Sequence, residues 1–388
     1  MDFRIESEDL RDAFATALER LAGDRPRRPS DVVDPDAGVE RWRRLCDDGW
    51  FDAFLPTAAS DTGWQVRGLT VAEALGARPI PEPVEAVAGF LLPLLHLLPG
   101  DRAADTATGV REGSRIIGVA PACLGADGRP VGHGGLATAP SLTEADGRPR
   151  VSGEVGGVLL PPGATSVVLL ASSPSRPDAT SVLDLPLSRA GVRVEQQDSI
   201  VRGRTVARLT LDDVAISPDD VIVGPPADVS AAVRTAAAAF SRTLDGVAIG
   251  GARTVLERTL AYTGEREQFG ARIGTFQAVK HQVADMAVLI EGARSLAYVA
   301  AWESDEHGVV PAAPTVAASR LTSASMYRRV TESGLQLRGA TGFTWEDGTH
   351  WWLRAAMFDG SMATDREGLI ASFGATLSPP VERSARPS

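Results

Sequence analysis

The spacing of hydrophobic residues changes twice along the chain, and this change limits the possible folds more than any other feature. Up to about residue 110, apolar residues recur at helical spacing, as in "ESEDLRDAFATALERLAG" and "GVERWRRLCDDGWFDAF". Between about Arg115 and Gly224, short β-branched runs such as "TSVVLLA" and "RTVARLTLDDVAI" alternate with Gly, Pro, Asp and Ser. Helical spacing returns from about Asp228. The sequence therefore predicts an α+β protein.

Three domains are expected from these zones. The first is an N-terminal helical domain over residues 1–110, with Trp42, Leu45, Trp50 and Phe54 as candidate core residues. A middle antiparallel β domain over 111–224 and a C-terminal helical bundle over 225–388 follow. The stretch "SAAVRTAAAAFSRTLDGVAIGGARTVLERTLAYTGERE" is rich in small residues, which allow helices to approach closely in the middle of a bundle.

Composition excludes several classes of protein. The formal net charge of -11 argues against a nucleic-acid partner. Cys46 and Cys123 are the only cysteines, and their spacing predicts neither a metal site nor a disulfide framework. The longest apolar run, 86–99, is too short to cross a bilayer. The acidic start "MDFRIESEDL" lacks the features of a signal peptide. We expect a soluble cytoplasmic protein with no metal and no membrane partner.

Two motifs carry a resemblance to a known family. The stretch "YTGEREQFGARIGTFQAVKHQVADM" contains Arg266, Phe269, Gly270 and, just inside the next helix, Gln277. It resembles the R-x-x-F-G turn and following Gln by which acyl-CoA dehydrogenases join two central bundle helices. Downstream, "LQLRGATGFTWEDGTHWWLRAA" resembles the family's Q-x-x-G-x-x-G-F segment, which precedes a helix beginning around an Arg, here Arg354. Either motif alone is a weak signal, but the pair is fairly specific.

The resemblance implies the family's fold: an N-terminal α-helical domain, a middle antiparallel β domain and a C-terminal four-helix bundle. It also implies bound FAD that is shared with a neighbouring subunit, and therefore an oligomer. The implied cofactor contacts are Arg266, Gln268, Phe269, Gln277, Gln336, Gly339 and Gly342.

The chemistry of these residues agrees with that implication. The forked guanidinium of Arg266 can hold a phosphate. Gly339 and Gly342 let backbone N–H groups approach phosphate oxygens that a side chain would block. Phe269 and Gln277 can cover and hydrogen-bond an adenine. A Gly-rich turn is also a common helix C-cap, so the joint pattern, rather than any one residue, favours a cofactor site.

The catalytic base of the family is missing from both of its usual places. Family dehydrogenases remove the α-proton of an acyl thioester with a glutamate, while the β-hydrogen leaves as hydride to the flavin. One place for the glutamate follows the helix that starts near Arg354, and here it is held by Ala363. The other lies on the long helix before Arg266, and here it is held by Phe240. Loss of a general base costs about 10²- to 10⁴-fold in rate.

Carboxylates near these places are alternative bases. Asp365 and Asp359 flank the first place, and Asp245 lies about one turn beyond the second. Glu346, in "GFTWE", is a further candidate, although its position on the cofactor-side loop favours a structural role. We take Asp365 and Glu346 as the candidate catalytic residues. Because Asp is one methylene shorter than Glu, a small backbone shift would be required.

The middle domain also departs from the family. No tryptophan lies between Trp64 and Trp302, so the family's flavin-covering tryptophan is missing, and "VAPACLGADGRP" and "SGEVGGVLLPPG" occupy the corresponding region. The sequence most resembles the divergent actinobacterial branch with "GFTWE-x-x-x-H", often one half of a heteromeric dehydrogenase.

Three functions stay open at this point. The first is an FAD-dependent acyl thioester dehydrogenase, or the partner subunit of one, in a homo- or hetero-oligomer. Its acyl carrier would be coenzyme A or a carrier protein. The second is a flavin-dependent monooxygenase or oxidase in a biosynthetic pathway. The third is a non-catalytic scaffold, against which the intact Arg266, Gln277 and Gly339 argue.

Overall fold

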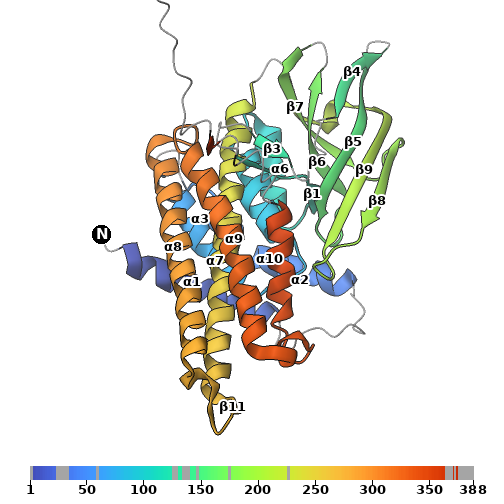
Figure 1. Cartoon of the computed structure of the whole chain (residues 1–388). Helices are drawn as coiled ribbons and strands as arrows, with labels where there is room; N and C mark the ends of the chain where they lie inside the picture. The colour runs from blue at the N-terminus through green and yellow to red at the C-terminus, as the bar shows by residue number, and fades with distance from the viewer. Residues whose placement is uncertain are drawn as a thin grey trace, which may run out of the picture.

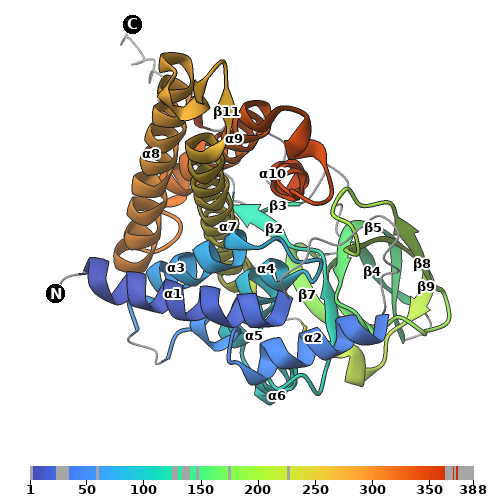
Figure 2. The ribbon, with the colours of Figure 1, turned by 90° about the horizontal axis from the view of Figure 1, so that it is seen from below.

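The computed structural model describes residues 3–22, 35–57, 61–124, 130–132, 140–145, 148–173, 176–224, 228–362, 370 and 373–374. Helices from the two ends of the chain pack together, and the β sheet lies beside them (Figure 1). The long C-terminal helices run side by side, with the N-terminal helices against them and the sheet to one side (Figure 2).

The N-terminal region is helical up to Arg111. It contains α1 (Phe3–Ala22), α2 (Pro35–Asp47), α3 (Trp64–Ala77), α4 (Val84–Ala86), a π-helical turn (Val87–Leu91), α5 (Leu92–Leu97) and α6 (Asp101–Arg111). The expected core residues Trp42, Leu45, Trp50 and Phe54 are all buried, so that prediction is confirmed. Trp42 packs on the Phe51 ring with centroids 5.3 Å apart, which joins α2 to the turn that follows it.

The middle region forms an eight-stranded sheet within the described residues, in the order β10-β7-β6-β1-β5-β9-β8, with β4 pairing with β5 and β6. Its strands are β1 (Ile117–Val119), β4 (Ser141–Ala145), β5 (Arg148–Leu160), β6 (Ser166–Ser173), β7 (Arg176–Pro186), β8 (Val192–Gln197), β9 (Thr205–Ala215) and β10 (Val221–Val223). A separate hairpin contains β2 (Ala122–Leu124) and β3 (Pro130–Gly132).

The sheet is not purely antiparallel. The expectation of an antiparallel domain holds for most neighbouring strands, but β1 and β4 each run parallel to β6. Alternation of apolar residues fixes which face of a strand is buried and leaves the direction of its neighbour open, because both kinds of pairing satisfy the same side-chain pattern. The corrected description is a mixed sheet with mainly antiparallel pairs.

The C-terminal region is a four-helix bundle. Its helices are α7 (Ser230–Glu265), α8 (Gln277–His307), α9 (Ala313–Arg338) and α10 (His350–Met362), and a hairpin of β11 (Glu267–Gln268) and β12 (Ala271–Arg272) joins α7 to α8. A core cluster that includes Val255, Ile290, Tyr327 and Trp352 takes one buried side chain or more from every helix of the bundle.

Helix α3 packs on α7 through backbone contact. A Cβ placed on Gly250 would lie 1.8 Å from the Glu73 carbonyl oxygen, and one on Gly76 would lie 2.0 Å from the Val247 carbonyl oxygen. No side chain fits at those distances, so these positions require glycine. This contact brings the N-terminal helices directly onto the bundle and fixes the position of Glu73 relative to α7.

The secondary structure changes between Arg111, where α6 ends, and Ile117, where β1 begins. It changes again between Val223, where β10 ends, and Ser230, where α7 begins. The division into domains at residues 110 and 224 stays a prediction. Over the described part of the chain, no helix has an apolar stretch that could cross a membrane. The same residues contain no group of three His, Cys, Asp or Glu side chains with metal-binding geometry.

Candidate functional site

The R-x-x-F-G motif forms the tip of the bundle, at the end where α7 passes into α8 (Figure 1). Helix α7 ends at Glu265, and the Arg266 N–H donates to the Tyr262 carbonyl oxygen at 2.9 Å. The side chains of Arg266, Gln268 and Gln277 are exposed. They come from the hairpin and the first turn of α8.

Phe269 is the most conspicuous residue of the tip. Its side chain is 95% exposed, and its φ of 54° lies in the left-handed region, which is a genuine outlier for a bulky residue. Its ring meets Phe276 edge-on at 6.4 Å, and Phe276 is itself exposed. The left-handed backbone conformation of Phe269 costs free energy, and its exposed ring contributes little to the stability of the chain itself. We therefore expect a ligand or a second chain to cover the ring.

The Q-x-x-G-x-x-G-F motif lies at the end of α9. Helix α9 ends at Arg338, and Gly339 follows with φ 60° at the start of a 3₁₀ turn over Gly339–Phe343. Gln336 and Gly339 are exposed, and no atom lies within 4 Å of a Cβ placed on Gly339. Gly342 is buried, and its Cβ would lie 3.0 Å from that of Arg338, so Gly342 allows the turn to fold back on α9.

Arg338 ties the two motifs together. Its guanidinium lies 5.1 Å from the centroid of the Tyr262 ring, donates to the Arg258 carbonyl oxygen and forms an ion pair with Asp347. The Tyr262 hydroxyl donates back to the Arg338 carbonyl oxygen at 3.4 Å. These contacts attach the last turns of α7 and α9 to each other, next to both motifs.

We call the resulting exposed face the tip surface. It is made by Arg266, Gln268, Phe269, Gln277, Gln336 and Gly339. The sequence predicted all six residues as cofactor contacts, together with Gly342, which lies beneath the surface. The structure brings the six to one end of the bundle, and their role as cofactor contacts stays a prediction.

The side chain of Phe240 is buried in the core. Its side chain is 1% exposed, and its ring meets Phe90 edge-on at 6.3 Å. Beside it, a Cβ placed on Gly89 would lie 2.5 Å from the Thr243 Oγ1 atom. The cavity lined by Gly89, Ala239, Thr243 and their neighbours measures about 10 Å³, which is room for at most one water molecule. Phe240 is not among the residues that line this cavity, and its own buried ring fills its place on α7.

Two of the alternative bases form one buried ion-pair network. The fully buried Arg320 lies 2.8 Å from Asp245 and also pairs with Asp359, while the Ser319 hydroxyl donates to Asp245 at 2.5 Å. Burial raises the pKa of Asp359 to about 6, although Arg320 opposes the shift. Burial likewise raises the pKa of Asp245. Arg320 therefore binds one oxygen of each carboxylate. Ser319 binds the second oxygen of Asp245, whereas Asp359 Oδ1 is buried without a hydrogen-bond partner among the described residues.

The remaining predicted positions divide between described and undescribed residues. Ala363 and Asp365 lie outside the described residues. Glu346 is exposed on the segment between α9 and α10. Arg354 lies within α10, with its guanidinium 5.7 Å from the Trp345 ring, and it donates to the Ile200 carbonyl oxygen at 3.4 Å.

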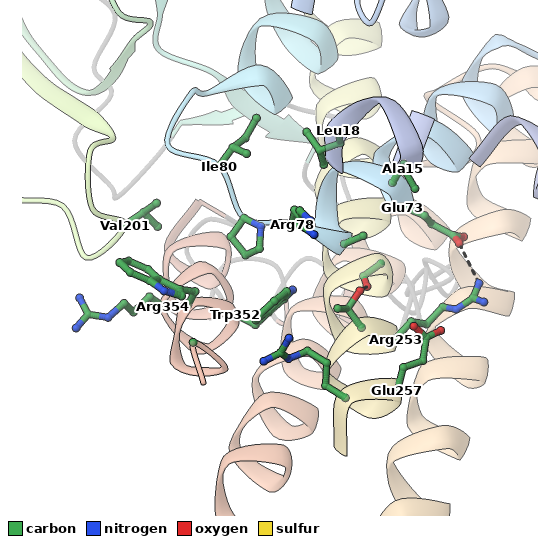
Figure 3. Close-up of a pocket in the computed structure, with 18 of the residues that line it drawn as sticks. Ala15, Leu18, Glu73, Arg78, Ile80, Val201, Arg253, Glu257, Trp352 and Arg354 are labelled. Carbon is green, nitrogen blue, oxygen red and sulfur yellow. Dashed lines mark hydrogen bonds and ion pairs between the residues drawn. The ribbon is translucent and has the colours of Figure 1, made fainter. Parts of the chain in front are cut away.

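Glu346 and Arg354 line a cavity of about 650 Å³ between α1, α3, α7, α10 and the turn between β8 and β9 (Figure 3). Sequence reasoning missed this cavity, because its lining residues come from segments far apart in the chain. One signal was present: Glu73 interrupts the apolar run "LTVAEALG", and it is a buried carboxylate 1% exposed. A charged residue inside a buried helix indicates a specific partner or a function.

Comparison with known proteins agrees with this arrangement. Residues 232–363 match the family model described as "Acyl-CoA dehydrogenase, C-terminal domain". The probable acyl-CoA dehydrogenase YngJ of Bacillus subtilis is 32% identical over 163 residues, which are 40% of this chain and 40% of that protein. The probable acyl-CoA dehydrogenase FadE25 of Mycobacterium tuberculosis is 35% identical over 147 residues, or 37% of this chain and 36% of that protein. The chain thus matches well under half the length of these curated relatives.

Solved structures match over nearly the whole chain. The ChsE4-ChsE5 complex of Mycobacterium tuberculosis has a TM-score of 0.75 at 21% identity, covering 98% of both chains. A glutaryl-CoA dehydrogenase of Mycobacterium smegmatis in complex with FADH2 has a TM-score of 0.77 at 17% identity, covering 95% of this chain and 94% of that one. The protein therefore has the acyl-CoA dehydrogenase fold, as the sequence predicted. Residues 232–363 therefore match the C-terminal domain of the acyl-CoA dehydrogenase family.

Proposed function

We propose that this chain is the supporting subunit of a heteromeric, FAD-dependent acyl thioester dehydrogenase. In this proposal its tip surface completes the flavin site of a second family chain, and that second chain supplies the catalytic carboxylate. The proposal rests on two observations together. The tip surface is exposed, and a buried phenylalanine, Phe240, stands where the family has a catalytic glutamate. The exposed tip surface offers groups suited to a dinucleotide, and the buried phenyl ring of Phe240 cannot accept a proton where the family has a base.

The residues of the tip surface fit a flavin dinucleotide. Arg266 offers a forked cation, and no ion pair ties it to another described residue. Gly339 leaves open space where a Cβ would stand, so phosphate oxygens can approach the backbone. Phe269 presents a fully accessible ring for an adenine. When bound, FAD would supply the hydride acceptor for α,β-desaturation, while Arg266 and Gln277 hold and orient the dinucleotide.

A heteromeric partner is supported by two further points. The tip surface points away from the rest of the chain, so a flavin bound there would be open to water unless a second subunit covered it (Figure 1). The structurally similar ChsE4-ChsE5 protein is a complex of two different chains. Arg320 and Ser319 together bind both oxygens of Asp245, which argues against Asp245 as a replacement base.

Anaerobic bleaching of bound flavin by a panel of acyl-CoAs tests the proposal. The chain on its own should not be bleached, whereas the complex with its partner should be. Ala363→Glu restores a carboxylate at the family position, and partial bleaching by this variant would show that the chain still presents a thioester to flavin. Rapid bleaching by the unmodified lone chain would overturn the supporting role. Flavin reoxidation by oxygen with turnover of an amine would instead favour the monooxygenase alternative.

The role of Arg266 has its own test. A charge-assisted hydrogen bond contributes about 1.5 to 3 kcal/mol, so Arg266→Ala in this chain should weaken flavin retention by the complex about 10- to 100-fold. The matched control is Arg272→Ala, an exposed arginine on the other strand of the same hairpin, which should leave retention unchanged. Full flavin occupancy in Arg266→Ala at sub-micromolar protein would refute the assignment.

A further inference from the structure

We propose that the 650 Å³ cavity is a second ligand site and that it binds a nucleoside phosphate. This site goes beyond the proposed function, because it shares no residue with the tip surface. Its lining includes the arginines Arg78, Arg253, Arg258 and Arg354 on which the proposal rests, and the carboxylates Glu73, Glu257, Glu346 and Asp347. We refer to it as the arginine cavity.

The walls of the arginine cavity are fixed by specific contacts. The glycine contact between α3 and α7 places Glu73 beside Gly250. The Trp352 Nε1–H donates to the Gly76 carbonyl oxygen at 3.2 Å, which attaches α10 to the end of α3. Arg354 attaches α10 to the turn between β8 and β9 through Ile200. The cavity is thus preformed, and its volume falls in the range of small-molecule sites, about 300 to 1,000 Å³.

One side of the cavity is basic. Arg258 is half-buried, its guanidinium lies 5.2 Å from the centroid of the Trp352 ring, and its Nε atom is buried without a hydrogen-bond partner in the described structure. Burial lowers the pKa of Arg258, and the positive charges of Arg338 and Arg78 lower it further, while the carboxylate of Asp347 opposes the shift. Figure 3 shows Arg78 and Arg354 on the same side of the cavity as Trp352. A bound phosphate would relieve this repulsion between neighbouring cations.

The opposite side offers hydrogen-bond acceptors. Glu73 Oε1 accepts from the Arg294 Nε–H at 3.1 Å, but its Oε2 atom is buried and accepts no hydrogen bond from any described residue. Arg253 forms an ion pair with that oxygen at 3.6 Å, so Glu73 lies between two arginines. Glu257 follows Arg253 by one turn of α7 and faces the cavity with it (Figure 3). Glu257 is exposed and forms no ion pair with a described residue, so it can accept from a ligand hydroxyl, as acidic residues commonly do from ribose.

The two sides together select the ligand class. A simple anion would use the arginines and leave Glu257 without a partner, while a simple amine would do the reverse. A nucleoside phosphate satisfies both, with its phosphate on the arginine side and its ribose on Glu257. Its base would lie against the Trp351 and Trp352 wall, where the buried Trp351 Nε1–H has no hydrogen-bond acceptor in the described part of the chain. Free nucleotides and the adenosine end of coenzyme A share this chemistry.

Isothermal titration calorimetry on the flavin-loaded, full-length protein tests the site, with ADP and coenzyme A as separate probes. We expect ADP to bind, and Arg253→Gln and Glu257→Gln each to weaken binding about tenfold. The control Arg328→Gln, an exposed arginine on α9 paired with Glu332, should have no effect. Equal binding of coenzyme A, lost in the same variants, would assign the site to the thioester carrier. Binding of ADP alone would assign it to a free nucleotide.

Three results would overturn the proposal. They are no heat from either probe at millimolar concentration, unchanged affinity in both cavity variants, and binding that disappears in Arg266→Ala or on adding excess FAD. The last result would place the nucleotide at the tip surface. Glu257→Gln keeps the experiment decisive if Arg253→Gln fails to fold, because Glu257 is exposed and its replacement leaves the core unchanged.

Discussion

Replacing Arg320 should be among the most destabilising single changes in the chain. Arg320 is 0% exposed and is the ion-pair partner of two buried carboxylates, Asp245 at 2.8 Å and Asp359. Removing one partner of a buried pair costs about 3 to 5 kcal/mol, because an uncompensated charge remains in the core. Arg320→Met leaves two such carboxylates, so we expect a loss near 5 kcal/mol, about a third or more of a typical unfolding free energy.

Urea unfolding at pH 7, followed by helical circular dichroism, measures this loss. Arg328→Met is the matched control on the same helix, because its pair with Glu332 is exposed and contributes about 0.5 kcal/mol or less. Adding Asp245→Asn and Asp359→Asn to Arg320→Met should recover much of the stability, since the stranded charges are then absent. A loss below about 1 kcal/mol for Arg320→Met would refute the reasoning, because it would mean that the carboxylates are solvated or already neutral.

Two further predictions concern packing and pH. Gly250→Ala should destabilise the fold strongly, because its Cβ would lie 1.8 Å from the Glu73 carbonyl oxygen and would force α3 away from α7. Gly292→Ala, in open space on α8, should instead stabilise by up to about 1 kcal/mol; equal effects in thermal unfolding would contradict the proposed backbone contact. For Asp305, burial raises the pKa from 3.8 to about 6, so the folded state holds the proton more tightly than the unfolded state. The stability of the wild type relative to Asp305→Asn should therefore fall as pH rises from about 4 to 6 and stay level above 7. A stability difference that does not vary with pH would show that folding does not shift the pKa of Asp305.

The helical parts of the fold followed closely from the sequence. Helical spacing was expected to return from about Asp228, and α7, α8, α9 and α10 all follow that residue. The small residues of α7 predicted close packing, and Gly250 shows why: its neighbour is backbone. The parallel pairing of β1 with β6 was not predictable, because strand direction depends on connections rather than on local spacing.

The candidate site was predictable only where its residues are close in sequence. The tip surface consists of two short motifs, and each could be recognised from a few consecutive residues. The arginine cavity joins residues such as Glu73, Arg258 and Arg354, which meet only after the two helical regions pack together. The closure around Phe240 likewise depends on Phe90, which is distant in the chain.

The central claim is that this chain completes a flavin site whose catalytic base belongs to another chain. The most direct test is the absorbance spectrum and light-scattering mass of the protein, purified alone and co-expressed with a family chain that carries the glutamate. We predict a hetero-oligomer with a full flavin band that acyl-CoA bleaches, and loss of that band when only this chain carries Arg266→Ala. A monomer of about 41 kDa that retains FAD and is bleached by acyl-CoA without a partner would contradict the account.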